Sequence, residues 1–266
     1  MSLLLRNASE YSRNPVLAGR SAVDEFPERI KAIAAEHRPS RMPFFQNLQM
    51  LPKSVARSPE ILGQIYLVYQ AAMHATRAAV YFMPYLNSPA LRRRKLQIYV
   101  DDDGLPGGET HHYQLARAFR NIGAELTIGD EEFGDTEELA RRVDPTTAYF
   151  LRLTRALYAR SLGPWCAVEV MSDDWMRALA DGLAVHHPGI HDEAYFAECF
   201  AGHVEERHAD ESLEVTCMVL RERPHLIDDT LRDAKAIAEA LDGVWDQLDN
   251  INAARHRAKE PLIAVR

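Results

Sequence analysis

The stretch 58-SPEILGQIYLVYQAAMHATRAAVYFMPYL-86 decides the fold class of this chain. Ser58 followed by Pro59 is typical of the N-cap and the first position of a helix. The apolar residues after them recur at helical rather than alternating spacing, and no further proline interrupts them before Pro84. The stretch therefore predicts a long helix.

Similar stretches follow along the chain, separated by short breaks. They are 26–38, 89–100, 110–123, 135–144, 146–161, 164–181, 192–222 and 228–255. Gly123, Gly182 and Pro224 stand where helices are expected to end, and no stretch alternates in the way a strand does. We therefore predict an N-terminal arm over residues 1–25 and one all-α domain over 26–266, a bundle of about eight or nine helices.

The composition narrows the classes of partner. Of the 266 residues, 47% are apolar and 26% are charged, with a formal net charge of −8. An acidic chain is poorly suited to bind a polyanion, so we expect no nucleic-acid partner. No apolar run is long enough to cross a membrane, and MSLLLRNASEYSRNP has too brief an apolar segment for a secretion signal. The three cysteines form no CxxC pair, which favours reduced thiols in a cytoplasmic protein.

Acidic and imidazole side chains gather in 98-IYVDDDGLPGGETHHYQLARAFRNIGA-124. Apolar residues recur there at the spacing of a buried helical stripe, at Leu115, Phe119 and Ile122. His112 lies one turn before this stripe, so we expect it to point inward and His111 outward. Glu109 lies one further turn back, and Asp102 ends the preceding helix across a glycine-rich turn. The group predicts either a metal site or a charged turn beside a packed core histidine.

Glu169 stands in the apolar run 165-WCAVEVM-171, in the middle of a predicted helix. A buried carboxylate needs a cation or a hydrogen-bond donor, because burying an unpaired charge is costly. The apolar neighbours on both sides favour an inward Glu169, although one charged position on an amphipathic helix is common. His74, in 71-AAMHATRAAV-80, is a similar case, since an imidazole among small residues is a metal ligand or, more often, a packed core histidine.

The predicted helix around 200-FAGHVEERHADESLEVTCMVL-220 carries two polar faces. One face consists of His203, Glu206 and Asp210, and the other consists of Glu205, His208 and Ser212. His203 and His208 are about 140° apart around the helix axis, so a regular helix cannot direct both at one metal ion. Apolar residues continue both faces, so periodicity does not decide which face is buried. Either set is also compatible with a salt-bridged outer face.

Three separate segments thus offer carboxylate or imidazole groups that could meet inside a bundle. Helical bundles build carboxylate metal sites in this way, with inward Glu and Glu-x-x-His groups on facing helices. Oxygen and nitrogen ligands without thiolates suit iron or manganese better than structural zinc. The sequence therefore predicts a non-heme iron site with one or two ions, and manganese is the alternative.

Taken in order, these segments resemble the heme-oxygenase-like diiron oxidases, within the superfamily that includes the TenA thiaminases and pyrroloquinoline quinone synthase. DDDGLPGGETHHYQLARAFRNIG is similar to the family's acidic turn, which is followed by His-x-x-Leu and a helix ending in glycine. WCAVEVMSDDWMRAL is similar to the helix whose single Glu binds metal, and EERHADESLEV to the acid-x-x-His segment of the last ligand helix. The resemblance runs from about residue 42 to the last helix. It implies a heme-oxygenase-like (TenA-like) bundle, often dimeric, so a homodimer is expected.

The resemblance also implies metal ligands by position. They are Asp102 or Glu109 as the first acid, followed by His112, Glu169, Glu205 and His208. The chain departs from the family pattern in two places. Ala201 stands where the family usually has a further histidine, with His203 nearby but out of register, and the upstream helix offers His74 in place of a glutamate.

The activity that the resemblance implies is that of an iron-dependent oxidoreductase, which uses O2 on a small amine- or carboxylate-containing metabolite. Two alternatives remain open at this point. One is a metal-free relative on the same fold, either a cofactorless oxidase or a TenA-type thiamine-salvage hydrolase. The other is a non-catalytic helical protein that binds partners. The TenA branch uses a cysteine nucleophile, and none of Cys166, Cys199 and Cys217 has the family-like setting.

Overall fold

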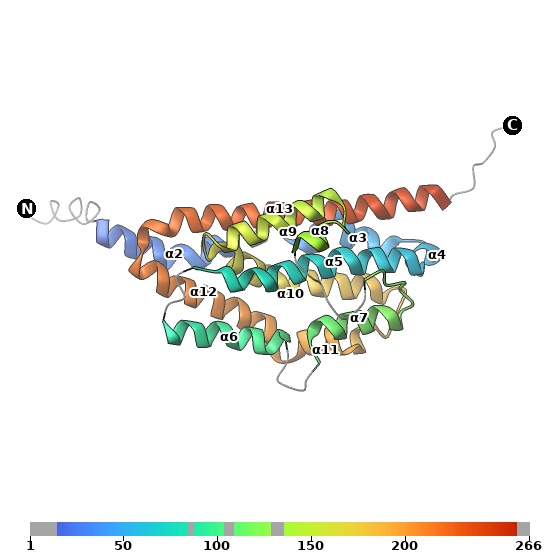
Figure 1. The fold of residues 1–266 in the computed structure, drawn as a ribbon, viewed down its shortest axis with the longest axis horizontal. Coiled ribbons are helices and arrows are strands. Elements are labelled where there is room, and N and C mark those ends of the chain that lie inside the picture. Colours follow the sequence, from blue (N-terminus) through green and yellow to red (C-terminus); the bar gives the residue numbers. More distant parts are fainter. Residues whose placement is uncertain (1–14, 85–87, 104–108, 129–135, 260–266) are drawn as a thin grey trace, which may run out of the picture.

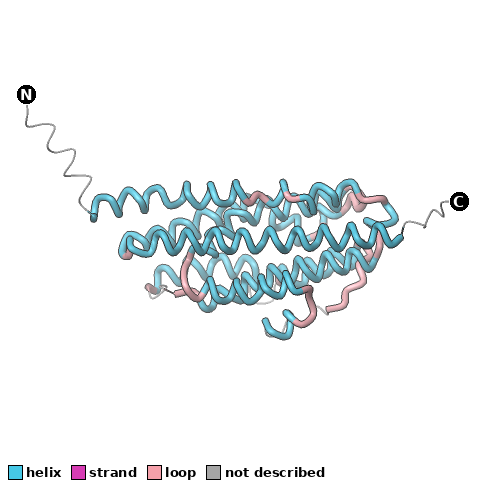
Figure 2. The backbone as a smooth tube through the Cα atoms, turned by 90° about the horizontal axis from the view of Figure 1, so that it is seen from above, coloured by secondary structure: helices cyan, strands magenta, loops and turns pink. Residues whose placement is uncertain are grey.

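The computed structural model describes residues 15–84, 88–103, 109–128 and 136–259. Within these ranges every regular element is a helix and none is a strand, which confirms the predicted all-α class. Figure 1 shows an elongated bundle whose long helices run along its longest axis, and Figure 2 shows the same arrangement from above. The described part of the chain contains no helix with the length and apolar character needed to cross a bilayer.

The helices follow one another with short connections. The α-helices of the described residues are α2 (Pro15–Glu36), α3 (Pro43–Met50), α4 (Lys53–Ala56), α5 (Pro59–Ala79), α6 (Pro89–Asp103), α7 (His111–Asn121), α8 (Thr136–Ala140), α9 (Pro145–Tyr158), α10 (Gly163–Ala184), α11 (Ala194–Phe200), α12 (Val204–Glu222) and α13 (Ile227–Lys259). Short 3₁₀ turns lie between several of them, namely η1 (Pro39–Arg41), η2 (Val80–Phe82), η3 (Ile190–Asp192), η4 (Ala201–His203) and η5 (Pro224–Leu226).

Helix α10 lies against helices on several sides, because it is apolar around most of its circumference. Its buried side chains include Trp165, Trp175 and Leu179, and it packs against α2, α3, α12 and α13. Trp175 lies beside Trp245 of α13, with ring centroids 6.4 Å apart. Large aromatic side chains contribute much of the apolar area that a core buries. The contact between α10 and α13 therefore anchors the bundle.

The first residue of α10, Gly163, lies against α13. A Cβ atom at this position would lie 1.8 Å from the carbonyl oxygen of Thr230. Only glycine therefore allows the two backbones to approach this closely. The same junction is held by the fully buried Asp233 of α13, which accepts hydrogen bonds from Ser161 Oγ over 2.9 Å and from Arg160 Nε over 2.8 Å.

Two predicted helices are interrupted. The helix predicted over 58–86 is α5 up to Ala79 and then the turn η2, although Ser58 takes the predicted N-cap position. The single helix predicted over 192–222 is wrong, because that segment contains α11, η4 and α12. Gly202 and His203 both adopt left-handed backbone angles, with φ of 58° and 59°. A right-handed helix cannot continue through such residues.

The N-terminal boundary also differs from the predicted one. Helix α2 begins at Pro15, so the helical part of the chain starts before residue 26. Residues 1–14 of the predicted arm lie outside the described residues. The predicted boundary fell beside Pro27, a residue type that usually begins or ends a helix, yet α2 continues through it.

Gly163→Ala is expected to destabilise the fold by at least about 3 kcal/mol, because the new methyl group overlaps the Thr230 carbonyl and forces α10 away from α13. Urea unfolding at neutral pH measures the difference. Gly189→Ala is the matched control, since Gly189 has a φ of −82° and nothing lies within 4 Å of its added Cβ. Its stability should change by less than about 1 kcal/mol. Equal stability of Gly163→Ala and the parent chain would contradict this account of the helix contact.

Candidate metal centre

Three side chains from two helices meet inside the bundle. Glu169 lies on α10, and Glu205 and His208 lie on α12. Each offers one ligand atom, and these atoms all lie within 4.8 Å of one another. Glu205 and His208 are each only 3% exposed. We refer to Glu169, Glu205 and His208 as the Glu/His triad.

The start of α12 determines how two members of the triad are placed. The helix begins directly after the left-handed Gly202 and His203, and the Gly202 carbonyl accepts a 2.6 Å hydrogen bond from Arg207 Nη1. A non-glycine residue with positive φ is uncommon. The break places Glu205 in the first turn of α12 and His208 three residues later on the same face. His208 Nδ1 consequently lies 3.9 Å from Glu205 Oε2.

Hydrogen bonds orient both carboxylates of the triad. Trp165 Nε1 donates to Glu169 Oε1 over 2.8 Å. The single proton of the Ser172 hydroxyl can serve Glu205 Oε2 or the Glu169 carbonyl oxygen, each 2.8 Å away. Hydrogen bonds of this kind hold carboxylate and imidazole ligands in place in metal sites. The two acids are therefore already fixed in a geometry suited to a shared cation.

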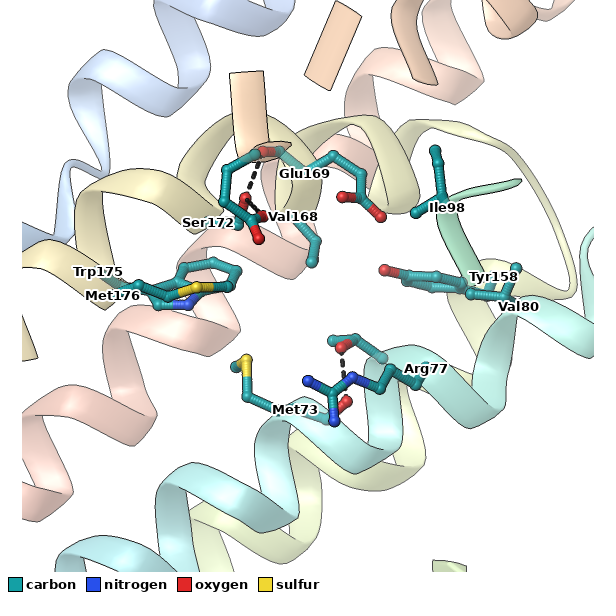
Figure 3. Close-up of a pocket in the computed structure, with 12 residues that line it drawn as sticks. Met73, Arg77, Val80, Ile98, Tyr158, Val168, Glu169, Ser172, Trp175 and Met176 are labelled. Atoms are coloured by element: carbon teal, nitrogen blue, oxygen red, sulfur yellow. Dashed lines mark hydrogen bonds between the residues drawn. The ribbon is translucent and has the colours of Figure 1, made fainter. Parts of the chain in front are cut away.

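A space of about 40 Å³, the inner cavity, lies beside Glu169 and Glu205. Its lining side chains are mostly buried, and they are Met73, Thr76, Arg77, Val80, Ile98, Tyr158, Val168, Glu169, Ser172, Trp175, Met176 and Glu205. Figure 3 shows the Arg77 guanidinium, the Tyr158 hydroxyl and the Glu169 carboxylate directed into this cavity. Charged and polar groups from α5, α9 and α10 thus face a shared, largely closed space.

Tyr158 is a neutral hydrogen-bond donor that lines the inner cavity. Its burial raises the pKa of the phenol well above 10, and the nearby Glu169 carboxylate raises it further. The hydroxyl therefore keeps its proton at neutral pH. Among the described residues it has no hydrogen-bond partner, so the proton is available to a molecule inside the cavity.

The structure decides between the two polar faces of α12. The face that contains Glu205, His208 and Ser212 is buried. On the other face, His203 Nδ1 lies 2.9 Å from Glu206 Oε2, and these side chains are 74% and 60% exposed. The face with His203 and Glu206 is therefore the salt-bridged outer face. The sequence had allowed this role for either face. His203 therefore lies outside the triad.

His112 and His74 lie together in a different place. His112 Nδ1 contacts the side-chain amide of Gln70 on α5. Burial, and after it the neighbouring His112, lowers the pKa of His74 to about 4. The two imidazoles thus lie close together, on α7 and α5. Neither belongs to the group of ligand atoms that the described residues bring together.

The two acids predicted beside His112 have different outcomes. Glu109 is engaged near the surface, where Arg117 Nη1 donates to its Oε1 over 2.6 Å. Asp102 lies in the last turn of α6, but its side chain is outside the described residues. The roles of Asp102, Glu109 and His112 as metal ligands stay predictions.

The expectation that His111 points outward was wrong, whereas His112 contacts the buried Gln70 of α5. His111 is 5% exposed, and its ring lies edge-on to Tyr195 with centroids 5.6 Å apart. His112 is half-buried. Helix α7 packs against both α5 and α11. The buried part of the α7 surface is therefore wider than the single apolar stripe that was used to predict the orientation of its histidines.

The cysteines are all free and buried. Cys166 Sγ lies 3.0 Å from Thr216 Oγ1, and burial raises the pKa of the Cys166 thiol to about 12. Burial also raises the pKa of Cys217. A protonated thiol is a poor nucleophile, so neither residue is suited to start cysteine-dependent hydrolysis.

Four residues around the triad were not found from the sequence: Arg77, Tyr158, Trp165 and Ser172. Trp165 and Ser172 lie one helical turn before and after Glu169, so a projection of α10 would have placed them on the same face. Arg77 and Tyr158 come from α5 and α9. Nothing in the spacing of those helices marks either residue, because only the packing of distant segments brings them to the cavity.

No protein-family model matches this chain, and neither the curated proteins nor the solved structures with which it was compared yielded a match. The resemblance to the heme-oxygenase-like oxidases therefore stays a prediction. What the chain can do is inferred from the Glu/His triad and the inner cavity alone.

Acid is expected to destabilise the fold through His74. Because the folded-state pKa of about 4 lies below the ordinary value of 6.5, the unfolded chain binds more protons between these pH values. Neutral His74 therefore contributes fully to the free energy of unfolding above pH 6.5. As the pH falls from 6.5 toward 4, this free energy decreases by about 2 to 3 kcal/mol.

Urea unfolding at pH 7 and pH 4.5 tests this, with His74→Gln compared with the parent chain. His74→Gln should lose less stability on acidification, because an amide does not titrate. The exposed His191 provides the control, and His191→Gln should keep the parent pH dependence. An unchanged loss in His74→Gln would show that other groups cause it.

Proposed function

We propose that this chain is a heme-oxygenase-like helical bundle that binds a divalent metal ion, preferably iron, in the Glu/His triad. We further propose that it is an oxidase that activates O2 and acts on a small metabolite. The observation that carries the proposal is the meeting of Glu169, Glu205 and His208 inside the bundle, with both carboxylates at the wall of a small cavity.

The ligand set favours iron over the other common ions. Two carboxylates and one imidazole offer oxygen and nitrogen atoms without a thiolate, which suits iron or manganese. Non-heme iron oxygenases commonly use three such ligands, two histidines and one carboxylate, and leave positions open for oxygen and substrate. Here the proportion of the two ligand types is reversed. The charge of Glu169 and Glu205 balances that of one divalent ion, so the triad supports a single ion.

The inner cavity has the size and character expected for dioxygen. A volume of about 40 Å³ holds roughly three water-sized molecules, which is too small for most metabolites. Met73, Val168 and Met176 supply an apolar lining. A bound metal ion would supply the redox chemistry at the cavity wall. Arg77 and the protonated Tyr158 would stabilise negative charge that develops inside the cavity, because fixed donors are most effective in a buried site.

An anaerobic titration with ferrous iron tests the metal site. We expect about one ion per chain, and we expect Glu205→Gln and His208→Ala each to lose binding while circular dichroism shows an unchanged helix content. Asp210→Asn is the matched control, since Asp210 lies on the same helix but is exposed. Full iron stoichiometry in both triad variants would overturn the assignment. Oxygen consumption by the iron-loaded chain with a reductant then tests the oxidase activity.

Ser172→Ala is expected to weaken iron binding by about tenfold or more, because its hydroxyl orients Glu205. Thr76→Ala is the control, since Thr76 also lines the cavity but its hydroxyl donates to the Met73 carbonyl. Competition with a colourimetric iron chelator measures both dissociation constants. Equal affinities of the two variants and the parent chain would show that the serine does not position a ligand.

A further inference from the structure

A second space, the outer groove, lies on the other side of the triad carboxylates. It has a volume of about 350 Å³ and is formed by α2, the η1 turn, α10 and α12. Its charged lining residues are Lys31, Arg38, Glu169, Asp173, Asp174, Glu205 and Glu206. It is much larger than the inner cavity and is more open to solvent. Five carboxylates and two cationic side chains therefore line one groove.

Glu169 and Glu205 line both the outer groove and the inner cavity. The two carboxylates line both spaces because of where they lie on their helices. On α10, Ser172 and Met176 face the inner cavity and Asp173 faces the groove, with Glu169 between the two directions. The two carboxylates are therefore a shared wall, and a molecule in the groove can reach the triad without passing through the cavity.

The carboxylates of the groove differ widely in their exposure to solvent. Glu206 is 60% exposed, Asp173 33% and Asp174 20% in their side chains, and Glu205 is 3% exposed. Acidic side chains that line a cleft raise the local concentration of cations and speed their association. The groove therefore offers an entering cation both exposed and buried carboxylates, and two of them, Glu169 and Glu205, belong to the triad.

The existing ion pairs of Asp173 and Glu206 leave these two carboxylates able to bind a cation. Asp174 is held by Arg38 Nε at 2.8 Å and by the Ser40 backbone N–H at 2.6 Å, so it is mainly structural. Asp173 pairs with Arg177 Nε at 2.8 Å, and Glu206 pairs with His203. Both of the latter pairs are partly or largely exposed, and such pairs are weak. Asp173 and Glu206 can therefore exchange partners at little cost.

The inner cavity has fewer acidic side chains than the groove. Nearly all of its lining side chains are buried, and the guanidinium of Arg77 faces into it (Figure 3). The charged lining residues of the cavity are Arg77 and the two shared carboxylates, whereas the groove has three further carboxylates, so a cation is attracted less strongly from the cavity side. The electrostatic asymmetry between the two sides therefore favours arrival of a cation from the groove.

We propose that the outer groove is the path by which a divalent metal ion reaches the Glu/His triad, and that Asp173 and Glu206 guide it there. This inference rests on the proposed function, because it requires that the triad binds metal. It assigns Asp173 and Glu206 to the rate of metal binding, whereas Glu169, Glu205 and His208 determine its affinity.

Rapid mixing of the full chain with Co²⁺ alone, a redox-stable substitute for ferrous iron, tests the proposal. Trp165 donates to Glu169 and Trp175 lines the inner cavity, so quenching of tryptophan fluorescence reports arrival at the triad. In Asp173→Asn/Glu206→Gln the association rate constant should fall about three- to tenfold at low ionic strength. The difference should shrink in 0.5 M salt, where charges are screened over about 4 Å. The dissociation rate and the stoichiometry should stay unchanged.

Glu138→Gln/Asp229→Asn is the matched control. It removes the same two charges, each beside an arginine in its own helix or turn, and neither residue lines the groove. Its association rate should equal that of the parent chain. Ala35→Phe supplies an uncharged test, because the exposed Ala35 lines the groove. This variant should bind Co²⁺ more slowly at every salt concentration.

The outcomes separate the two proposals. If the parent chain binds Co²⁺ but all variants associate at the same rate, the groove is not the path and the metal site stands. If Asp173→Asn/Glu206→Gln and its control Glu138→Gln/Asp229→Asn slow association equally, the cause is the net charge of the chain. That result would also contradict the proposed path. If the parent chain binds neither Co²⁺ nor ferrous iron, the proposed metal centre fails, and the path fails with it.

Discussion

The meeting of two carboxylates, one buried and one half-buried, is the constraint on which the site depends. Glu169 and Glu205 approach each other within the Glu/His triad, where both desolvation and mutual repulsion oppose them. The bundle offsets part of this cost by directing Trp165 and Ser172 at them as hydrogen-bond donors. A cation between the two acids would remove much of the rest. An arrangement that is unfavourable when empty is well suited to hold an ion.

Helix packing maintains this arrangement. Gly163 allows α10 to lie directly against α13, and the aromatic contact between Trp175 and Trp245 fixes the same pair of helices further along. Because α13 fixes one side of α10, the opposite side of α10 can direct Glu169 toward α12. The left-handed residues Gly202 and His203 then set where α12 begins, and hence which of its residues meet α10. Backbone geometry at Gly163, Gly202 and His203 thus influences how the two acids are placed.

The sequence was sufficient for the helical class, for most helix positions and for the unusual setting of Glu169, because these depend on local periodicity and on the character of nearby residues. It was insufficient for α12, where two polar faces have equal apolar continuations and only packing selects the one with His208. A glycine inside a helical pattern is tolerated, so Gly202 gave no clear sign of the break. The predicted pairing of acids with His112 relied on positions in a turn and stays a prediction; among the described contacts, His112 lies beside Gln70.

All three members of the triad come from α10 and α12, which are separated in sequence only by η3, α11 and η4. The two helices are antiparallel, since Ser172 contacts Glu205 near the start of α12 while Cys166 contacts Thr216 further along it. Contacts between segments close in sequence form faster than distant ones, because less chain entropy is lost in closing the loop. The ligand set can therefore assemble during folding as one local hairpin of helices. An ion bound by these two helices would favour their pairing, because it binds the folded arrangement and not the unfolded chain.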